Sequence, residues 1–206
     1  MDIDGVLNGM DWFASETYKQ RHLKLKSERD PVADGDDYND GADYNAAYMY
    51  GTHFDPACVD LLKGILQRTG AEVVLSSTWR LSEITRAAVA KLDIPIIGVT
   101  PPPMKTRGEE IESWLVSNRF AGNFVIIDDY FPDEFGALQD RLVQTCFGRG
   151  LMATAAERAI ELLMQPEPWS VRGLRVIPSV TVNRQQPSIN RHGRVEGYSS
   201  TIRPLE

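Results

Sequence analysis

Short apolar segments alternate with amphipathic helical segments between residues 55 and 164, and this alternation constrains the fold more than any other feature of the sequence. The first helical segment shows the pattern clearly: Asp55-Pro56 is typical of a helix start, an apolar stripe follows, and Gly70 is typical of a helix end. Strands of four to six apolar residues separated by helices are typical of a mainly parallel sheet covered by helices. The sequence therefore predicts an α/β fold. Its predicted strands are residues 71–76, 94–99, 124–127 and 142–146, and the later predicted helices are residues 81–92, 108–118 and 154–164.

The chain has 206 residues, a length that suits one domain with an insertion and a tail. We assign the α/β domain to residues 1–165. Within it, residues 9–54 are rich in Tyr, Asp and Gly and keep no helical or strand period, which predicts an irregular insertion. Residues 166–206 form a tail rich in Arg, Pro, Ser, Gln and Asn. Two interpretations of the tail stay open: a hairpin that pairs residues 174–177 with 179–182, or disorder.

Composition excludes some classes of protein. The net charge of −7 argues against a general nucleic-acid coat, because phosphate contacts need a basic surface. No apolar run approaches the roughly 20 residues of a membrane span, and Asp2 and Asp4 stand where a signal peptide would carry Lys or Arg. Cys58 and Cys146 show no disulfide or metal-site spacing. We expect a cytoplasmic protein with no membrane partner.

Polar residues at the strand ends are the candidates for chemistry, because ligands of parallel α/β sheets bind beyond the carboxyl ends of the strands. Residues 1–4 read as a strand end that breaks at Gly5, with Asp2 and Asp4 on one side of the extended chain. Paired carboxylates suit a metal, or a nucleophile that works beside a general acid. A calcium loop fits less well, because its glycine stands at the sixth position. A chance pair of acids also remains open.

Three later segments offer further polar residues. Ser76 follows an apolar strand and could bind a phosphoryl oxygen or cap the next helix. Lys105 and Arg107 precede a helix, where a phosphate binds well, although such cations are often only surface charges. Asp128 and Asp129 directly follow the most strand-like run of the chain. Because acids are costly to bury without a paired cation, this pair predicts a metal site.

In this order, the four segments resemble the four motifs of the haloacid dehalogenase-like (HAD) superfamily. The similarity is greatest to the HAD branch of Swiss army knife RNA-repair-type proteins, and it covers residues 1–8 and 55–164. It implies a HAD-like (Rossmann-like) three-layer sandwich with a mainly parallel central sheet and a small cap inserted at residues 9–54. The segments that carry the resemblance are Asp2-Ile3-Asp4-Gly5-Val6-Leu7-Asn8, Ser76, Arg107-Gly108-Glu109-Glu110-Ile111 and Ile127-Asp128-Asp129.

The resemblance implies a role for each residue that would contact phosphate. Asp2 would be the nucleophile that forms an aspartyl-phosphate. Asp4 would protonate the leaving oxygen and then activate water. Ser76 would hold a phosphoryl oxygen, and Arg107 would neutralise the transferring group, with Lys105 as the second choice for that role.

The resemblance also implies a magnesium ion as cofactor. Asp128 and Asp129 would bind Mg²⁺ together with Asp2 and the carbonyl of Asp4. The expected function is a magnesium-dependent phosphomonoesterase, whose substrate is a phosphorylated small molecule such as a nucleotide, or a nucleic-acid end. The alternative is a catalytically silent HAD-fold binding module that contacts nucleic acid through its Arg-rich tail.

The segment before Asp2 departs from the family pattern. Members of the superfamily usually carry several apolar residues before the first motif Asp, and here Met1 precedes it directly. A central strand normally runs about five or six residues. We therefore expect the start of the natural chain to lie upstream of Met1.

Overall fold

The computed structural model describes residues 1–28, 47–166, 188–189 and 195–196. The chain divides into two compact units, Met1–Gly173 and Leu174–Glu206. In the second unit the described elements are β5 (Ser188–Ile189) and β6 (Val195–Glu196), which pair in antiparallel fashion. The hairpin predicted from residues 174–182 lies outside the described residues. Over the described part of the chain, no helix combines the length and the apolar character needed to span a membrane.

Two pairs of parallel strands form the sheet of the first unit, and they coincide with or overlap the predicted strands. β1 pairs with β2, and β3 pairs with β4. The chain between helices is short and apolar in each case, and a polar residue stands at or just after the carboxyl end of each strand. β1 and β3 pack into the core, whereas Ile97 and Val99 of β2 are exposed. The predicted α/β fold is confirmed. The strands are β1 (Val73–Leu75), β2 (Ile96–Val99), β3 (Ile126–Asp128) and β4 (Leu142–Gln144).

Residues 1 and 2 lie between the two strand pairs and join them. The Met1 nitrogen donates to the carbonyl of Val74 at 2.9 Å, and the Ser76 N–H donates to the Met1 carbonyl at 2.8 Å. On the other side, the Asp2 N–H donates to the carbonyl of Ile127 at 3.0 Å. These bonds follow the pattern of parallel pairing. The strands therefore lie in the order β2, β1, residues 1–2, β3 and β4, which places Asp2 beside the end of β3.

The extended chain ends earlier than predicted. Our expectation of a strand reaching Asp4 is wrong, because the chain turns at Ile3, whose carbonyl accepts hydrogen bonds from the N–H groups of Val6 and Leu7. Ile3, Val6 and Leu7 are fully buried in this turn, so burial of their side chains holds the loop against the core.

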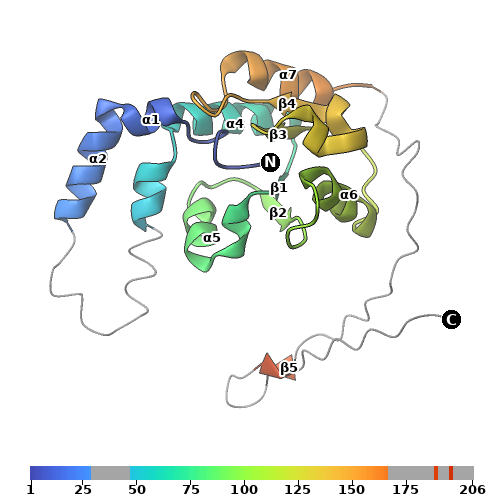
Figure 1. The fold of residues 1–206 in the computed structure, drawn as a ribbon, viewed down its shortest axis with the longest axis horizontal. Coiled ribbons are helices and arrows are strands. Elements are labelled where there is room, and N and C mark those ends of the chain that lie inside the picture. Colours follow the sequence, from blue (N-terminus) through green and yellow to red (C-terminus); the bar gives the residue numbers. More distant parts are fainter. Residues whose placement is uncertain (29–46, 167–187, 190–194, 197–206) are drawn as a thin grey trace. The chain divides into compact units, whose positions relative to one another are not determined.

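Helices cover both sides of the strands. Figure 1 shows α4 and α7 on one side, and α5 and α6 on the other. α4 begins and ends as the sequence predicts, since the Asp55 side chain accepts from the Ala57 N–H and Gly70 adopts a left-handed conformation with φ of 68°. The bounds are α4 (Pro56–Thr69), η1 (Thr78–Leu81), α5 (Glu83–Ala90), α6 (Arg107–Ser117), η2 (Pro132–Arg141) and α7 (Ala153–Leu163).

The described part of the insertion is helical, so the prediction of an irregular segment is wrong there. It contains α1 (Met10–Ala14), α2 (Glu16–Ser27) and helical residues 47–53. α2 buries none of its residues and therefore has no apolar stripe that a periodicity argument could detect. Its helix start is instead stabilised by Ser15, whose hydroxyl accepts from the Tyr18 N–H at 3.0 Å.

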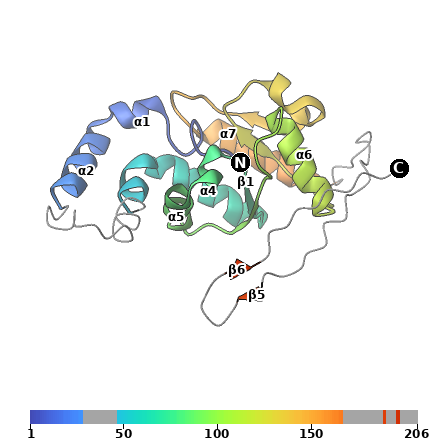
Figure 2. The same ribbon diagram turned by 60° about the horizontal axis from the view of Figure 1, so that its bottom comes forward.

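Aromatic and histidine side chains hold the helices of the insertion together. α2 and residues 47–53 lie side by side in both ribbon views (Figures 1 and 2), and the Tyr48 hydroxyl hydrogen-bonds His22 Nδ1 between them. The Trp12 indole N–H donates to the carbonyl of Thr52 at 2.7 Å. These contacts hold together the two segments that flank residues 29–46. Residues 29–46 themselves lie outside the described residues.

An apolar cavity of about 310 Å³ lies between β1 and β3. Its walls include residues 71–74 and 124–127 and apolar side chains of α4 and α6, and Met1 contributes to the lining. Met1 and Asp2 pair with the carboxyl ends of β1 and β3. The cavity lies next to Met1, on the side of the amino ends of the same two strands. The cavity therefore lies where a longer central strand would run.

We predict that a short Val-Leu-Ile segment added before Met1 raises the melting temperature. Each apolar side chain that becomes buried stabilises by roughly 1.5–3 kcal/mol, so the rise should be about 5 °C or more for a domain of this size. The measurement is thermal unfolding followed by circular dichroism, with a Gly-Ser-Gly segment of the same length as control. Equal melting temperatures for the two extensions would contradict a strand site in the cavity.

Candidate active site

Three carboxylates meet where residues 1–2 and β3 end. A carboxylate oxygen from each of Asp2, Asp128 and Asp129 lies within 4.8 Å of those of the other two. Asp2 and Asp128 are buried, with 5% and 0% of their surfaces exposed, and Asp129 is half-buried. The parallel pairing of residues 1–2 with β3 accounts for the proximity, since it sets the Asp2 backbone next to Ile127.

Gly5 allows the three carboxylates to lie close together. Gly5 has a φ of +67°, and a Cβ atom placed on it would lie 2.5 Å from the Asp129 carboxyl carbon. Any other residue would both strain the backbone and displace Asp129. Its carbonyl also accepts a hydrogen bond from the Thr145 hydroxyl at 2.6 Å, which ties the turn to the chain after β4.

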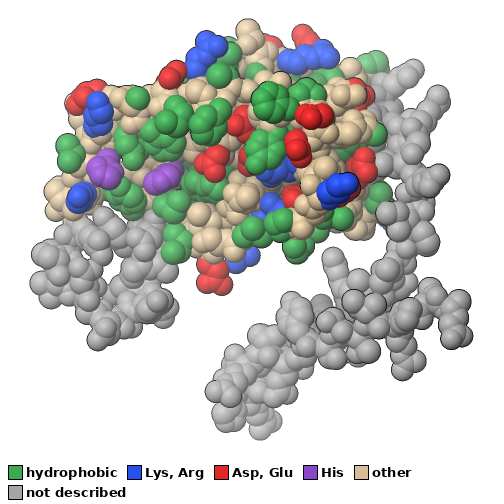
Figure 3. All heavy atoms as spheres, viewed as in Figure 1, with side chains coloured by type: hydrophobic (Ala, Val, Ile, Leu, Met, Phe, Trp, Pro, Cys, Tyr) green, Lys and Arg blue, Asp and Glu red, His purple; other side chains and the backbone are tan. Residues whose placement is uncertain are grey.

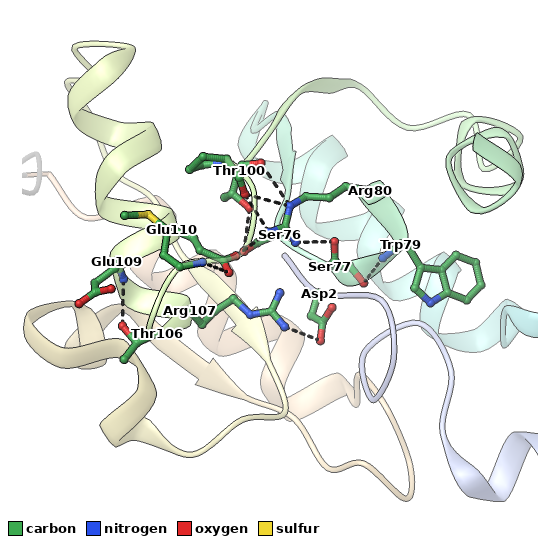
Figure 4. A network of polar contacts seen from close by, with 12 residues as sticks. Asp2, Ser76, Ser77, Trp79, Arg80, Thr100, Thr106, Arg107, Glu109 and Glu110 are labelled. Carbon is green, nitrogen blue, oxygen red and sulfur yellow. Dashed lines mark hydrogen bonds and ion pairs between the residues drawn. The ribbon is translucent and has the colours of Figure 1, made fainter. Parts of the chain in front are cut away.

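Arg107 is a cation that faces these carboxylates, as is the buried amino group of Met1, whose charge interacts with Asp128 and Asp2. Its Nη2 lies 3.7 Å from Asp2 Oδ2 and its Nε lies 3.8 Å from Asp128 Oδ2, while the guanidinium stands over the Tyr130 ring at 5.2 Å. Arg107 is the first residue of α6, whose N-cap is Thr106, and Figure 4 shows its side chain pointing from the helix toward Asp2. The start of α6 lies close against η2, because a Cβ on Gly108 would lie 2.8 Å from the Phe135 carbonyl oxygen.

Two buried polar atoms of the site form no hydrogen bond. Among the described residues, Arg107 Nη1 and Asp128 Oδ2 belong to the few buried side-chain atoms that form no hydrogen bond. Burial and the negative charge of Asp2 together raise the pKa of Asp128 to about 6, while Arg107 acts in the opposite direction. Burial lowers the pKa of Arg107, but the neighbouring groups, Asp2 and Asp128 first among them, raise it by more in sum. A buried carboxylate oxygen and a buried guanidinium N–H that both lack a hydrogen-bond partner fit a cation and an anion bound together.

Asp4 lies outside the three-carboxylate group and has partners of its own. Its Oδ2 accepts from the Trp79 indole N–H at 2.9 Å, and its Oδ1 accepts from the Asn8 amide at 3.0 Å. Asn8 is buried, and its Oδ1 accepts from the Gly5 N–H at 3.0 Å. The carboxylate of Asp4 is therefore held in one orientation by two donors.

Ser76 and Lys105 occupy very different positions. Ser76 is 1% exposed at the end of β1, and its hydroxyl accepts from the Thr100 hydroxyl at 3.4 Å. Lys105 is exposed, and among the described residues it forms no ion pair with the carboxylates of the site. Of the two candidate cations, Arg107 is the one that contacts Asp2 and Asp128.

The sequence reasoning gave no role to Trp79, Arg80, Asn8 or Tyr130, although all four contact the site or its loops. Their contacts are made by individual side chains, which a periodic pattern does not reveal. The one available signal was position, since Trp79 and Arg80 follow Ser76 closely and Tyr130 follows Asp129.

The face of the molecule in Figure 3 carries charges of both signs. Near its middle, basic side chains lie between acidic ones with hydrophobic side chains around them. The exposed hydrophobic residues include Phe131 and Tyr130, which directly follow Asp129 in sequence. The mixed charge distinguishes this region from a purely acidic or purely basic surface.

A parallel α/β layer with carboxylates at the ends of neighbouring strands, and a basic residue at the start of the helix beside them, defines a HAD-like domain. The chain belongs to the family of HAD domains in Swiss Army Knife RNA repair proteins, whose sequence model matches residues 1–156. The match includes residues 9–54, which the motif resemblance did not cover. No curated protein and no solved structure matches the chain significantly. Membership in this family indicates a hydrolase of the phosphatase type.

Proposed function

We propose that the protein is a magnesium-dependent phosphomonoesterase that transfers phosphate to Asp2. The observation that carries this proposal is that two buried atoms beside the Asp2 carboxylate, Asp128 Oδ2 and Arg107 Nη1, form no hydrogen bond. A metal phosphate complex offers a cation to the first and oxygen atoms to the second. A site that only stabilised the fold would gain from apolar residues or from direct hydrogen bonds instead.

Asp2, Asp128 and Asp129 would hold the magnesium ion, with the carbonyl of Asp4 as a further ligand. Oxygen ligands are those that magnesium prefers, and the ion usually keeps several waters as well. When bound, it neutralises charge on the carboxylates and on the phosphoryl group. The charge and burial of the three carboxylates support this assignment.

The chain's own residues then divide the work of phosphoryl transfer. A carboxylate oxygen of Asp2 attacks phosphorus, and Arg107 Nη1 and the Ser76 hydroxyl donate to phosphoryl oxygens. Asp4 gives a proton to the leaving oxygen and later takes one from the attacking water. The hydrogen bonds from Trp79 and Asn8 support this role, because they fix the direction in which the Asp4 carboxylate points.

Nucleotides or nucleic-acid ends are the substrates that we propose to test first. The family description refers to RNA repair proteins, and aromatic residues of the insertion end close to Asp4, since His53 and Phe54 pack against the Trp79 ring at 6.0 and 5.3 Å. Of these rings His53 is partly exposed, whereas Phe54 and Trp79 are buried, so His53 is the ring available to stack on a base. We further propose that α1, α2 and residues 47–53 act as a small cap on a three-layer sandwich, which the helices on both sides of the strands support.

A phosphatase screen tests the proposal. We expect phosphate release from a generic aryl phosphate and from nucleoside monophosphates in millimolar magnesium, and loss of that release with EDTA. The screen also separates an enzyme from a catalytically silent binding module. Absence of release from every phosphomonoester in the screen, by a folded protein whose melting temperature responds to magnesium, would favour the silent module.

A further inference from the structure

Arg80 lies outside the proposed catalytic set, yet its side chain is the most completely bonded charged group near the site. The side chain is 3% exposed. It donates to the carbonyl of Ser77 at 2.7 Å, to the carbonyls of Thr100 at 3.2 Å and Pro101 at 2.8 Å, and to Glu110 Oε2 at 2.8 Å. All three guanidinium nitrogens take part, so the planar fork of Arg is fully used.

Glu110 completes the connection from the other side. Its side chain is 9% exposed, and its second oxygen accepts from the Met104 N–H at 3.3 Å. The Arg80–Glu110 pair therefore binds three segments together: the loop after β1, the loop after β2, and the first turns of α6. Figure 4 shows this pair between the loop that carries Ser76 and the helix that carries Arg107.

Arg107 depends on such support because its own contacts at the site are loose. Its ion-pair distances to Asp2 and Asp128 are 3.7 and 3.8 Å, beyond hydrogen-bond distance, its Nη1 forms no hydrogen bond, and its guanidinium stands over the Tyr130 ring at 5.2 Å. The place where α6 begins therefore helps to set the position of the guanidinium. Glu110 lies about one helical turn after Arg107, and Ser77 is the neighbour of Ser76. The Arg80–Glu110 pair therefore holds the chain next to each of the two residues proposed to bind phosphate.

We propose that the Arg80–Glu110 ion pair is the positioning element that holds Arg107 and Ser76 at the right distance from Asp2. The proposal rests on the phosphatase function above. Arg80 and Glu110 do not contact substrate in it; they act through the two loops and through α6. Displacement of a positioned group by about 1 Å is enough to lower a rate about 100-fold, so loss of the pair should reduce turnover much more than it reduces folding.

The test uses Arg80→Lys and Glu110→Gln. Lysine keeps the charge but cannot reach three carbonyls and a carboxylate at once, and glutamine keeps the shape of Glu110 without its charge. We expect each variant to lower kcat by about 10- to 100-fold with a much smaller change in KM. The magnesium-induced rise in melting temperature should stay as in the wild type, because the three carboxylates are untouched. The double variant should lose little more activity than Arg80→Lys alone.

The control is Arg141→Lys, since Arg141 is also a largely buried arginine beside an acid, with 8% of its surface exposed and Asp140 at 3.8 Å. It should keep kcat within about twofold, as expected of a residue that contacts no group of the site. A role in folding alone would lower the folded fraction of Arg80→Lys and leave kcat per folded molecule unchanged. That result would overturn the proposal.

A second measurement does not depend on turnover. Binding of orthovanadate in the presence of magnesium, followed by calorimetry, should weaken by about tenfold or more in Arg80→Lys and stay unchanged in Arg141→Lys. Equal vanadate affinity in the wild type and Arg80→Lys would overturn the positioning role even if no phosphomonoester is hydrolysed. Conversely, an inactive wild type that binds vanadate more tightly than Arg80→Lys would contradict the phosphatase function and support the positioning role.

Discussion

Replacing Asp2 with asparagine should lower the phosphatase rate by about three orders of magnitude or more, because it removes the proposed nucleophile while changing side-chain volume very little. The bond of Asp2 to Ile127 is made by its backbone N–H and not by its carboxylate, so the fold should persist. The measurement is kcat for an aryl phosphate in saturating magnesium, together with thermal unfolding of both proteins. The matched control is Asp60→Asn, which changes an exposed carboxylate on α4 and should leave kcat unaltered.

A residual rate would decide the role of Asp2. If Asp2→Asn keeps more than about a tenth of the wild-type rate, where loss of a nucleophile costs orders of magnitude, Asp2 does not carry the phosphate. If both the rate and the melting temperature collapse, Asp2→Ser and Asp2→Ala provide further variants of smaller volume. An inactive variant that melts as the wild type does is the expected outcome.

Asp128→Asn should have opposite effects on the metal-free and the magnesium-bound protein. Burial raises the pKa of Asp128 from 3.8 to about 6, so between these values the folded protein holds a proton that the unfolded chain has lost. The stability of the metal-free protein therefore falls as the pH rises through about 4 to 6, by up to about 3 kcal/mol. Above about pH 6 the folded protein carries the full cost of burying the charged Asp128. An asparagine never ionises and therefore does not carry this cost.

At about pH 7 we therefore expect the metal-free Asp128→Asn protein to melt several degrees above the wild type. Its melting temperature should also change less between about pH 4 and pH 5.5, because at higher pH the Met1 amino group, whose pKa burial lowers to about 6, also loses its proton in the folded protein. Millimolar magnesium should stabilise the wild type by mass action and leave Asp128→Asn almost unchanged, because a proposed ligand has been removed. Thermal unfolding with EDTA and with magnesium, at these two pH values and at about pH 7, measures all three effects. A metal-free variant no more stable than the wild type would contradict a net cost of burying the charged Asp128.

The parts of the fold that the sequence predicted are those whose residues face a common core. In α4 the side chains of Cys58, Leu62 and Ile65 are buried along one stripe between a capping Asp55 and a left-handed Gly70. α2 has no buried face, so its polar sequence resembled a loop although its residues favour a helix. The insertion of residues 1–2 between β1 and β3 depends on backbone hydrogen bonds, which no side-chain pattern encodes.

The residues of the candidate site also divide into those whose positions the sequence predicted and those whose positions it did not. Asp2, Asp128 and Arg107 were expected to meet because each follows a strand or begins a helix at the same edge of the sheet, and the structure brings them together. The separate hydrogen bonding of Asp4 depends on Trp79, a residue 75 positions away in the chain. The Arg80 contacts are mostly with backbone carbonyls, whose positions exist only once the loops have folded.

Trapping the phosphorylated intermediate would show directly whether phosphate passes through the carboxylate of Asp2. The protein is quenched in acid during turnover with magnesium, reduced with borohydride to convert an acyl phosphate to an alcohol, and digested for mass spectrometry. We expect conversion of Asp2 alone, absent when substrate is omitted and absent in Asp2→Asn. Conversion at another carboxylate, or none at all in an actively hydrolysing protein, would contradict it.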